Sequence, residues 1–147
     1  MPRMIFVNLP VKDLPATRRF FGALGFTFNE QFSDDTAACM VLSDTIFVML
    51  LTHAKWATFG DIPIHDAQKG AQVFLCLTRE DRLAVDSFVE KAAAAGGKAD
   101  PTPSQDYGFM YGRSYADPDG HIWEVMWMDP EAAAEANEAF AAQAGGG

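Results

Sequence analysis

The sequence predicts an α+β fold built from two βαβββ modules. The first observation behind this prediction is an internal repeat, because one strand-like, one helix-like and three more strand-like segments occur twice with similar spacings. The second is an Asp-Gly pair at 119–120 between apolar runs, which is a strong hairpin signal. The third is an apolar content of 49% in 147 residues, which is enough for one core and excludes a disordered chain.

The first module occupies residues 1–52. Residues 5–11 are apolar enough for a strand, and Asp13 is placed to cap a helix whose first turn holds Pro15. Apolar residues then recur at helical spacing until Gly25 ends the helix. Three strand-like runs complete the module, at 27–32, 36–42 and 45–51.

The second module, residues 71–128, repeats this order. Residues 72–78 are typical of a buried strand, and Thr78 with Asp81 resembles a capping box. The helix that follows ends at Gly96-Gly97. The remaining segments are an extended stretch at 98–105, a strand at 108–116, a turn at 117–120 and a strand at 121–128.

Two further segments lie outside the modules. Residues 53–70 connect them and include a predicted short helix near Trp56 and Phe59. Residues 129–147 form an Ala-rich tail, in which Asp129 caps a helix.

Charge and composition limit the partners. The formal net charge is −9, which argues against a nucleic-acid partner because phosphate binding needs clustered Lys and Arg. No window approaches the roughly 18 uninterrupted apolar residues of a membrane span. No secretory signal is apparent, so we expect a reducing cytoplasm, where Cys39 and Cys76 are free thiols in apolar stretches and behave as small buried hydrophobic residues.

Two segments carry a resemblance to a known family. These are VNLPVKDLPATRRFFGALGF at 7–26 and FMYGRSYADPDGHIWEV at 109–125. With the doubled βαβββ pattern, they resemble the vicinal oxygen chelate superfamily, which contains glyoxalase I, bleomycin-resistance proteins and extradiol dioxygenases. The resemblance implies a curved mixed sheet around a cleft, and a homodimer in which modules of two chains share a site.

The resemblance also implies four metal-ligand positions on the concave face. They fall on Phe6, on Leu50 (or Met49 if the register slips by one), on Gln72 and on Glu124. Because Phe and Leu donate nothing, only Gln72 and Glu124 remain, and this pair would hold Zn²⁺, Ni²⁺ or Fe²⁺ poorly. Asn8 could contribute an amide oxygen to the same face. We therefore expect no cofactor, with a divalent metal as the less favoured alternative.

Strand alternation predicts the lining of the cleft. On the last strand, Glu124 and Met126 share one side, and the neighbouring tryptophans share the other. Glu124 is a candidate for proton transfer, or else a structural carboxylate bound to Gln72 or a tyrosine. The other residues expected to line a mostly apolar small-molecule pocket are Phe6, Asn8, Val48, Leu50, Gln72, Phe74 and Cys76.

Another candidate group is the polar-aromatic cluster of Tyr111 and Arg113, which share one face of a predicted strand. Arg113 could bind a carboxylate or phosphate on a ligand, or it could pair with Asp117 or Glu124. The sequence leaves both readings open.

Three functions are compatible with these patterns. The first is metal-free binding of a small molecule, cationic or planar and aromatic, in an apolar, acidic cleft. The alternative is a metal-dependent lyase or dioxygenase with an atypical site at Glu124 and Gln72. The third is metal-free acid–base catalysis by Glu124 with a tyrosine or Arg113. Whether the protein is an enzyme therefore stays open.

Overall fold

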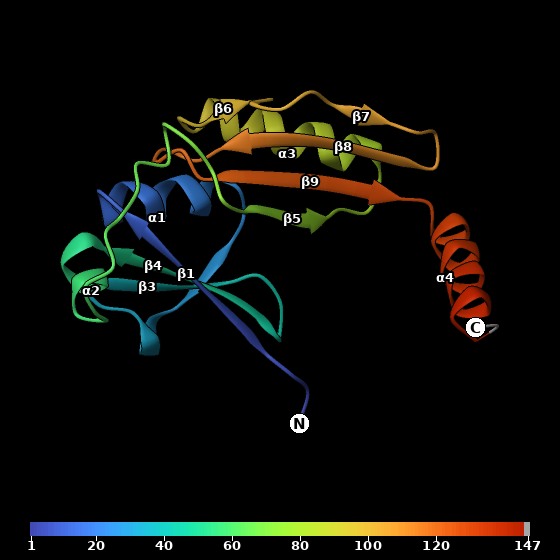
Figure 1. Ribbon diagram of the computed structural model, residues 1–147. Helices are drawn as coiled ribbons and strands as arrows, with labels where there is room; N and C mark the ends of the chain where they lie inside the picture. Colours follow the sequence, from blue (N-terminus) through green and yellow to red (C-terminus); the bar gives the residue numbers. More distant parts are fainter. Residues whose placement is uncertain (146–147) are drawn as a thin grey trace.

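The computed structural model describes residues 1–145, and its first module forms a four-stranded sheet (Figure 1). The strand order is β1-β4-β3-β2, in which β1 and β4 are parallel and the other pairs are antiparallel. Its elements are β1 (Ile5–Val11), α1 (Leu14–Ala23), β2 (Thr27–Asn29), the short 3-10 helix η1 (Glu30–Phe32), β3 (Ala37–Val41) and β4 (Ile46–Thr52).

The second module repeats this topology in the order β5-β9-β8-β6, with β7 also paired to β8. Again the first and last strands, β5 and β9, are parallel neighbours. A short helix, α2 (His53–Ala57), begins the segment between the modules. The module consists of β5 (Phe74–Thr78), α3 (Arg82–Ala94), β6 (Lys98–Ala99), β7 (Gln105–Asp106), β8 (Met110–Ala116) and β9 (Ile122–Met128).

The predicted fold class is confirmed, and the structure adds detail to it. In the part of the chain that the structure describes, the strands form two separate mixed sheets rather than one continuous sheet. The strand predicted at 27–32 ends at Asn29, because the Asn29 side chain accepts a hydrogen bond from the backbone N–H of Gln31 and begins η1.

Aspartate N-caps show how the two halves correspond. The carboxylate of Asp13 accepts from the N–H of Ala16 at 3.0 Å, and that of Asp81 accepts from the N–H of Ala84 at 2.7 Å. Asp81, and not Thr78, is therefore the cap of α3. Because both caps follow a core-facing leucine at the same spacing, Leu9 of β1 corresponds to Leu77 of β5.

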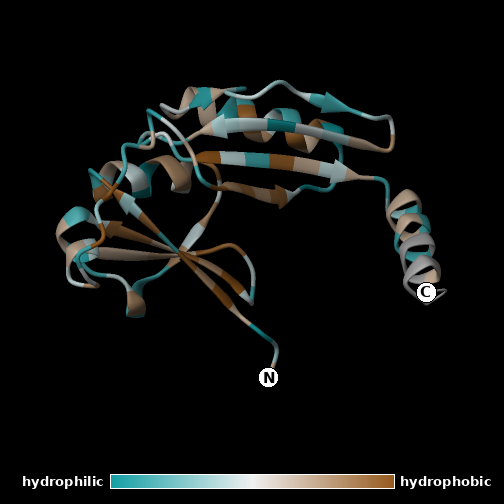
Figure 2. Ribbon diagram, in the orientation of Figure 1, coloured by the Kyte–Doolittle hydropathy of each residue, from teal (hydrophilic) through white to brown (hydrophobic). Residues whose placement is uncertain are grey.

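One hydrophobic core joins the modules. Phe21 of α1 meets the edge of Trp123 of β9, with ring centroids 5.3 Å apart, and Phe26 meets Phe88 of α3 at 5.7 Å. These contacts bury the helix-facing sides of both sheets together. Figure 2 shows hydrophobic residues along β1 and β5, whereas β7 is hydrophilic.

After β9 the chain forms α4 (Pro130–Gly145), which projects away from both sheets in Figure 1. This agrees with the helix predicted for the Ala-rich tail, whose last residues, 146–147, lie outside the described part. Among residues 1–145, no helix is long and apolar enough to cross a membrane.

Gly97, just after α3, lies in close contact with the end of β8 and with α1. A Cβ added at Gly97 would lie 2.5 Å from the carbonyl oxygen of Ala116 and 2.9 Å from the ring of Phe20, whereas one added at Gly22 in α1 would meet nothing within 4 Å. We predict that Gly97→Ala lowers the free energy of unfolding by about 1–3 kcal/mol through overpacking. Gly22→Ala should raise it by about 0.5–1 kcal/mol. Urea unfolding of both variants measures this, and equal effects would contradict the packing described.

Candidate functional site

Each sheet has one face in the core and one face turned away from the helices, which we call the open face. In the first module, Val7 pairs with Val48 and Leu9 with Leu50, and all four pack into or against the core. The intervening pairs, Phe6 with Phe47 and Asn8 with Met49, therefore lie on the open face. The rings of Phe6 and Phe47 stack at 4.8 Å there, and Phe6 is 51% exposed.

This register corrects the position assigned to β4. Leu50 was predicted to face the cleft, but it is 0% exposed in the core, and Val48 is buried beside it. The prediction was wrong by one residue, because strand neighbours point to opposite faces. Met49 occupies the open-face position instead.

On the second sheet, the predicted alternation of β9 is confirmed. Trp123 and Val125 are buried in the core, so Glu124 and Met126 lie on the open face. Cys76 of β5 is the register partner of Glu124. The expectation that Cys76 is buried was wrong, because its strand turns it to this exposed face, whereas Cys39 is buried as predicted.

The register also shows that Phe74, and not Gln72, is the residue of the second module that corresponds to Phe6. Gln72 lies in a bend before β5 begins at Phe74. Since Leu9 corresponds to Leu77, Phe6 corresponds to Phe74, which is 50% exposed on the open face. Aligning the two capping residues, Asp13 and Asp81, in the sequence would have revealed that Phe6 corresponds to Phe74.

The four corresponding positions are therefore Phe6, Met49, Phe74 and Glu124. A catalytic divalent cation needs about three protein donors and one open position. Only Glu124 offers a charged oxygen, so the side chains at these positions do not fit the four-ligand site that the resemblance implies. Nor does any group of three or more His, Cys, Asp and Glu side chains within residues 1–145 gather closely enough to hold a metal ion.

Glu124 lies in a cavity of about 260 Å³ on the open face of the second sheet. Its walls include Cys76 of β5, Met110 of β8 and Met126 of β9, and residues 102–105 border it. Gly112, opposite Met126, adds no side chain to the floor. Desolvation first and the negative charge of Glu124 second raise the pKa of the Cys76 thiol. The thiol is therefore held in its protonated, weakly nucleophilic form.

Asn8 and Gln72 lie in a different cavity, of about 300 Å³, where β1 approaches the segment before β5. The structure thus brings Asn8 together with Gln72, and Glu124 together with Met126, in two separate cavities. Phe6 and Phe74 line neither cavity and stand exposed on the open faces.

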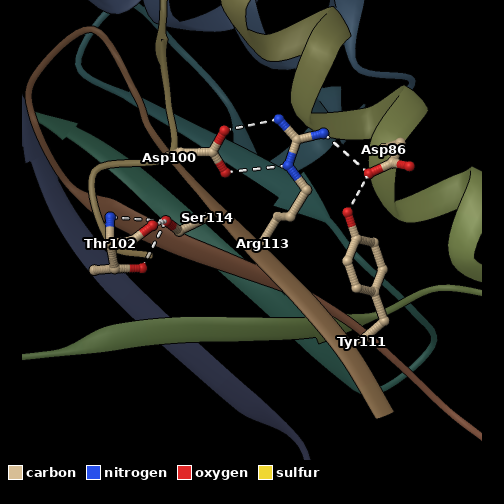
Figure 3. A network of polar contacts seen from close by, with 6 residues as sticks. All are labelled: Asp86, Asp100, Thr102, Tyr111, Arg113 and Ser114. Atoms are coloured by element: carbon tan, nitrogen blue, oxygen red, sulfur yellow. Dashed lines mark hydrogen bonds and ion pairs between the residues drawn. The ribbon is translucent and has the colours of Figure 1, made fainter. Parts of the chain in front are cut away.

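Tyr111 and Arg113 do not belong to the open face. They lie on the side of β8 that faces α3, where Tyr111 packs against the core. The guanidinium of Arg113 donates to Asp100 at 3.1 and 2.8 Å and to Asp86 of α3 at 3.0 Å, and the Tyr111 hydroxyl donates to Asp86 at 2.6 Å (Figure 3). The placement of Tyr111 in the ligand cleft was therefore wrong. Arg113 does line the Glu124 cavity, but its guanidinium is held by Asp86 and Asp100.

The partners of Arg113 also decide between the alternatives left open by the sequence. Its ion pairs are with Asp86 and Asp100, and not with Asp117 or Glu124. The hydrogen bond from Tyr111 lowers the pKa of Asp86, and the hydrogen bond and positive charge of Arg113 lower it further. The network joins β8 to α3 and to the segment after β6, so its role is structural.

The Asp-Pro-Asp-Gly turn is likewise structural. The buried carboxylate of Asp117 accepts hydrogen bonds from the backbone N–H groups of Asp119, Gly120 and His121 and from the indole of Trp123. Burial raises the pKa of Asp117. Gly120 has a φ of +99°, a conformation that favours glycine.

Comparison with known proteins finds one matching family model and several solved structures that are similar to this chain. Residues 3–43 match a family model described as bleomycin resistance protein-like N-terminal. A glyoxalase-related enzyme from Fulvimarina pelagi is 20% identical, with a TM-score of 0.72 over 86% of this chain and 88% of that one. A glyoxalase/bleomycin resistance protein/dioxygenase family enzyme from Burkholderia phytofirmans is also 20% identical, with a TM-score of 0.70 over 86% and 99%.

This chain has the glyoxalase/bleomycin-resistance/dioxygenase fold. A genomically encoded fosfomycin resistance protein from Listeria monocytogenes shares it at 17% identity, with a TM-score of 0.61 over 86% of this chain and 91% of that one. A search of curated proteins finds no match. The fold that the resemblance implies is thus confirmed, and at these identities the structural similarity shows the fold alone.

The contribution of the Arg113 ion pairs to the stability of this glyoxalase/bleomycin-resistance fold can be tested by substitution. We predict that Arg113→Gln lowers the free energy of unfolding by about 1–3 kcal/mol, because Asp86 and Asp100 lose their charged partner. Arg3→Gln, at an exposed position before β1, should change it by less than about 0.5 kcal/mol. Chemical denaturation measures both variants, and an Arg113 variant as stable as the Arg3 control would refute the role.

Proposed function

We propose that the open face around Glu124 binds a small cationic, aromatic molecule without a four-ligand metal centre. The observation that carries the proposal is the set of corresponding positions Phe6, Met49, Phe74 and Glu124, where three of the four side chains are apolar. A metal-dependent lyase or dioxygenase would need further donors beside Glu124, and this register supplies none from the other three positions.

The walls of the Glu124 cavity support a ligand of this class. The sulfur atoms of Met110 and Met126 are polarisable and make favourable contacts with aromatic rings. The carboxylate of Glu124 has neither a salt-bridge partner nor a hydrogen-bond partner among the described residues. A ligand cation can therefore pair with Glu124, and the net charge of −9 attracts such a ligand over a longer range.

The Arg113 network bears on the acid–base alternative. Tyr111 does not line the Glu124 cavity, because its hydroxyl is bound to Asp86 on the other side of β8. Arg113 does line the cavity, but its guanidinium is already paired with Asp86 and Asp100. Glu124 is then a binding carboxylate whose task is to orient a ligand. This favours binding over a two-residue acid–base mechanism.

The test uses two aromatic probes of opposite charge, 9-aminoacridine and anthracene-9-carboxylate, titrated in the presence of a chelator. We predict that the cation binds more tightly than the anion, and that Glu124→Gln weakens cation binding about 5- to 20-fold through loss of a charge-assisted contact. Glu90→Gln, on the exposed surface of α3, is the matched control and should leave affinity unchanged. Equal weakening in both variants, no binding of the cation, or binding that requires added Ni²⁺ or Zn²⁺ would contradict the proposal.

We further propose a homodimer in which the open faces of two copies cover each other. Support comes from large apolar side chains exposed at both open faces and their edges, namely Ile5, Phe6, Val73 and Phe74. Large apolar side chains left exposed on a sheet face are typical of a protein interface when they gather into a patch. Association of the two open faces would also close the Glu124 cavity off from solvent.

Sedimentation velocity tests the dimer at roughly 50 µM, within the range where weak homodimers form. We predict that Phe74→Glu shifts the wild-type dimer to monomer, because it places a charge in an apolar interface. Leu83→Glu is the control, because Leu83 is 79% exposed on α3, away from the open faces. A monomeric wild-type protein, or dissociation by Leu83→Glu alone, would rule out this arrangement.

A further inference from the structure

The segment between the modules encloses a groove separate from the Glu124 cavity. Its end lies against the Asp-Pro-Asp-Gly turn, where the side-chain amide of Gln68 donates to the carbonyl of Pro118 at 3.1 Å. A Cβ added at Gly120 would lie within 2.9 Å of Gln68 and Ala67, so glycine permits this close approach. The indole of Trp56 donates to the carbonyl of Ile62 at 2.9 Å, which holds the start of the segment.

The groove has two compartments of different character. The first, of about 300 Å³, has apolar walls from Val7, Leu9, Trp56 and Ile122. The second, of about 220 Å³, is polar. Both compartments are lined by Pro10, His65, Ala67 and His121, so they adjoin each other.

All three histidines of the chain line the polar compartment, although they lie far apart in the sequence. They are His53 at the start of α2, His65 between the modules and His121 before β9. A ring nitrogen of His121, Nε2, lies 2.8 Å from the carbonyl oxygen of Pro10. Because a carbonyl only accepts, Nε2 carries the proton, and Nδ1 is the nitrogen that can bind another.

The other charged groups facing these histidines are Lys12, Asp66 and Asp119, with the buried Asp117 behind His121. Asp119 accepts a hydrogen bond from the backbone N–H of Lys12 at 2.8 Å, and Asp66 accepts one from the N–H of Gln68 at 2.9 Å. Protonation of the three imidazoles adds up to three positive charges to this compartment.

The spacing of the histidines argues against a metal ion. In the described chain, no three of the His, Cys, Asp and Glu side chains lie close enough together to share one. Imidazoles spread around a cavity are placed instead to contact different atoms of a larger polar group. An acidic protein that gathers its histidines beside a lysine offers a place for an anion once the imidazoles are charged.

We infer that this groove binds an amphiphile with an anionic head, such as a medium-chain carboxylate. Its apolar body lies in the first compartment, and its head lies among His53, His65, His121 and Lys12. The first compartment holds roughly ten heavy atoms at about 30 Å³ each. Binding strengthens as the imidazoles gain protons, because each added proton gives the head group another cation to contact. The inference does not depend on the function proposed for Glu124.

Calorimetric titration of the full chain with decanoate and with decanol, at about pH 6 and about pH 8, tests this inference. We expect decanoate to bind at least about fivefold more tightly at the lower pH, and decanol affinity not to change with pH. The indole N–H signal of Trp56 in NMR spectra should move in both titrations, because Trp56 lines the apolar compartment.

Matched variants identify the head group's contacts. The exposed pair His53→Gln/His65→Gln should remove most of the pH dependence for decanoate. Lys12→Gln should weaken decanoate binding, whereas Lys98→Gln, on the exposed strand β6, should not. Glu124→Gln should leave decanoate affinity unchanged, which separates this site from the one under Proposed function.

Three results would overturn the inference. The first is equal affinity for decanoate and decanol at both pH values, or no binding of either. The second is a pH dependence that survives in the double histidine variant. The third is micromolar binding of Ni²⁺ or Zn²⁺ that is lost in that variant, which would make the histidines a metal site.

Discussion

The contact between the two modules, in which Phe21 packs edge-on against Trp123 and Phe26 against Phe88, determines where every other feature lies. It buries the helix-facing sides of both sheets in one core. Because side chains alternate along a strand, burial of one face assigns the residues between to the open face. Met49, Cys76 and Glu124 reach that face for this reason, and not because of any local preference.

The sequence predicted the repeat, the helices and the alternation of β9, because Trp and Glu there differ sharply in character. It misassigned Leu50 because IFVMLLT of β4 is apolar on both faces, so periodicity cannot show which face is buried. Gln72 was misassigned for a related reason, since the residues before and within β5 carry no alternating signal. The aspartate caps carried the missing information, because Asp13 and Asp81 align Phe6 with Phe74.

Other parts of the site could not be predicted, because they depend on contacts between distant residues. Arg113 resembles a ligand-binding arginine until Asp86 and Asp100 are placed beside it by the packing of α3 on β8. The three histidines come together only through the path of the segment between the modules. The two cavities consequently differ in their ionisable groups: one holds the carboxylate of Glu124, whereas the other holds three imidazoles with Lys12, Asp66 and Asp119.

The most direct test of the central claim, that the open face binds a ligand without a metal centre, is NMR of methyl-labelled methionines during titration with 9-aminoacridine and a chelator. Met110 and Met126 line the Glu124 cavity, whereas Met40 is 0% exposed in the core on the helix-facing side of its sheet. The account predicts that the signals of Met110 and Met126 shift and that of Met40 does not. Binding that leaves Met110 and Met126 unchanged, or shifts that appear only when a divalent metal replaces the chelator, would contradict it.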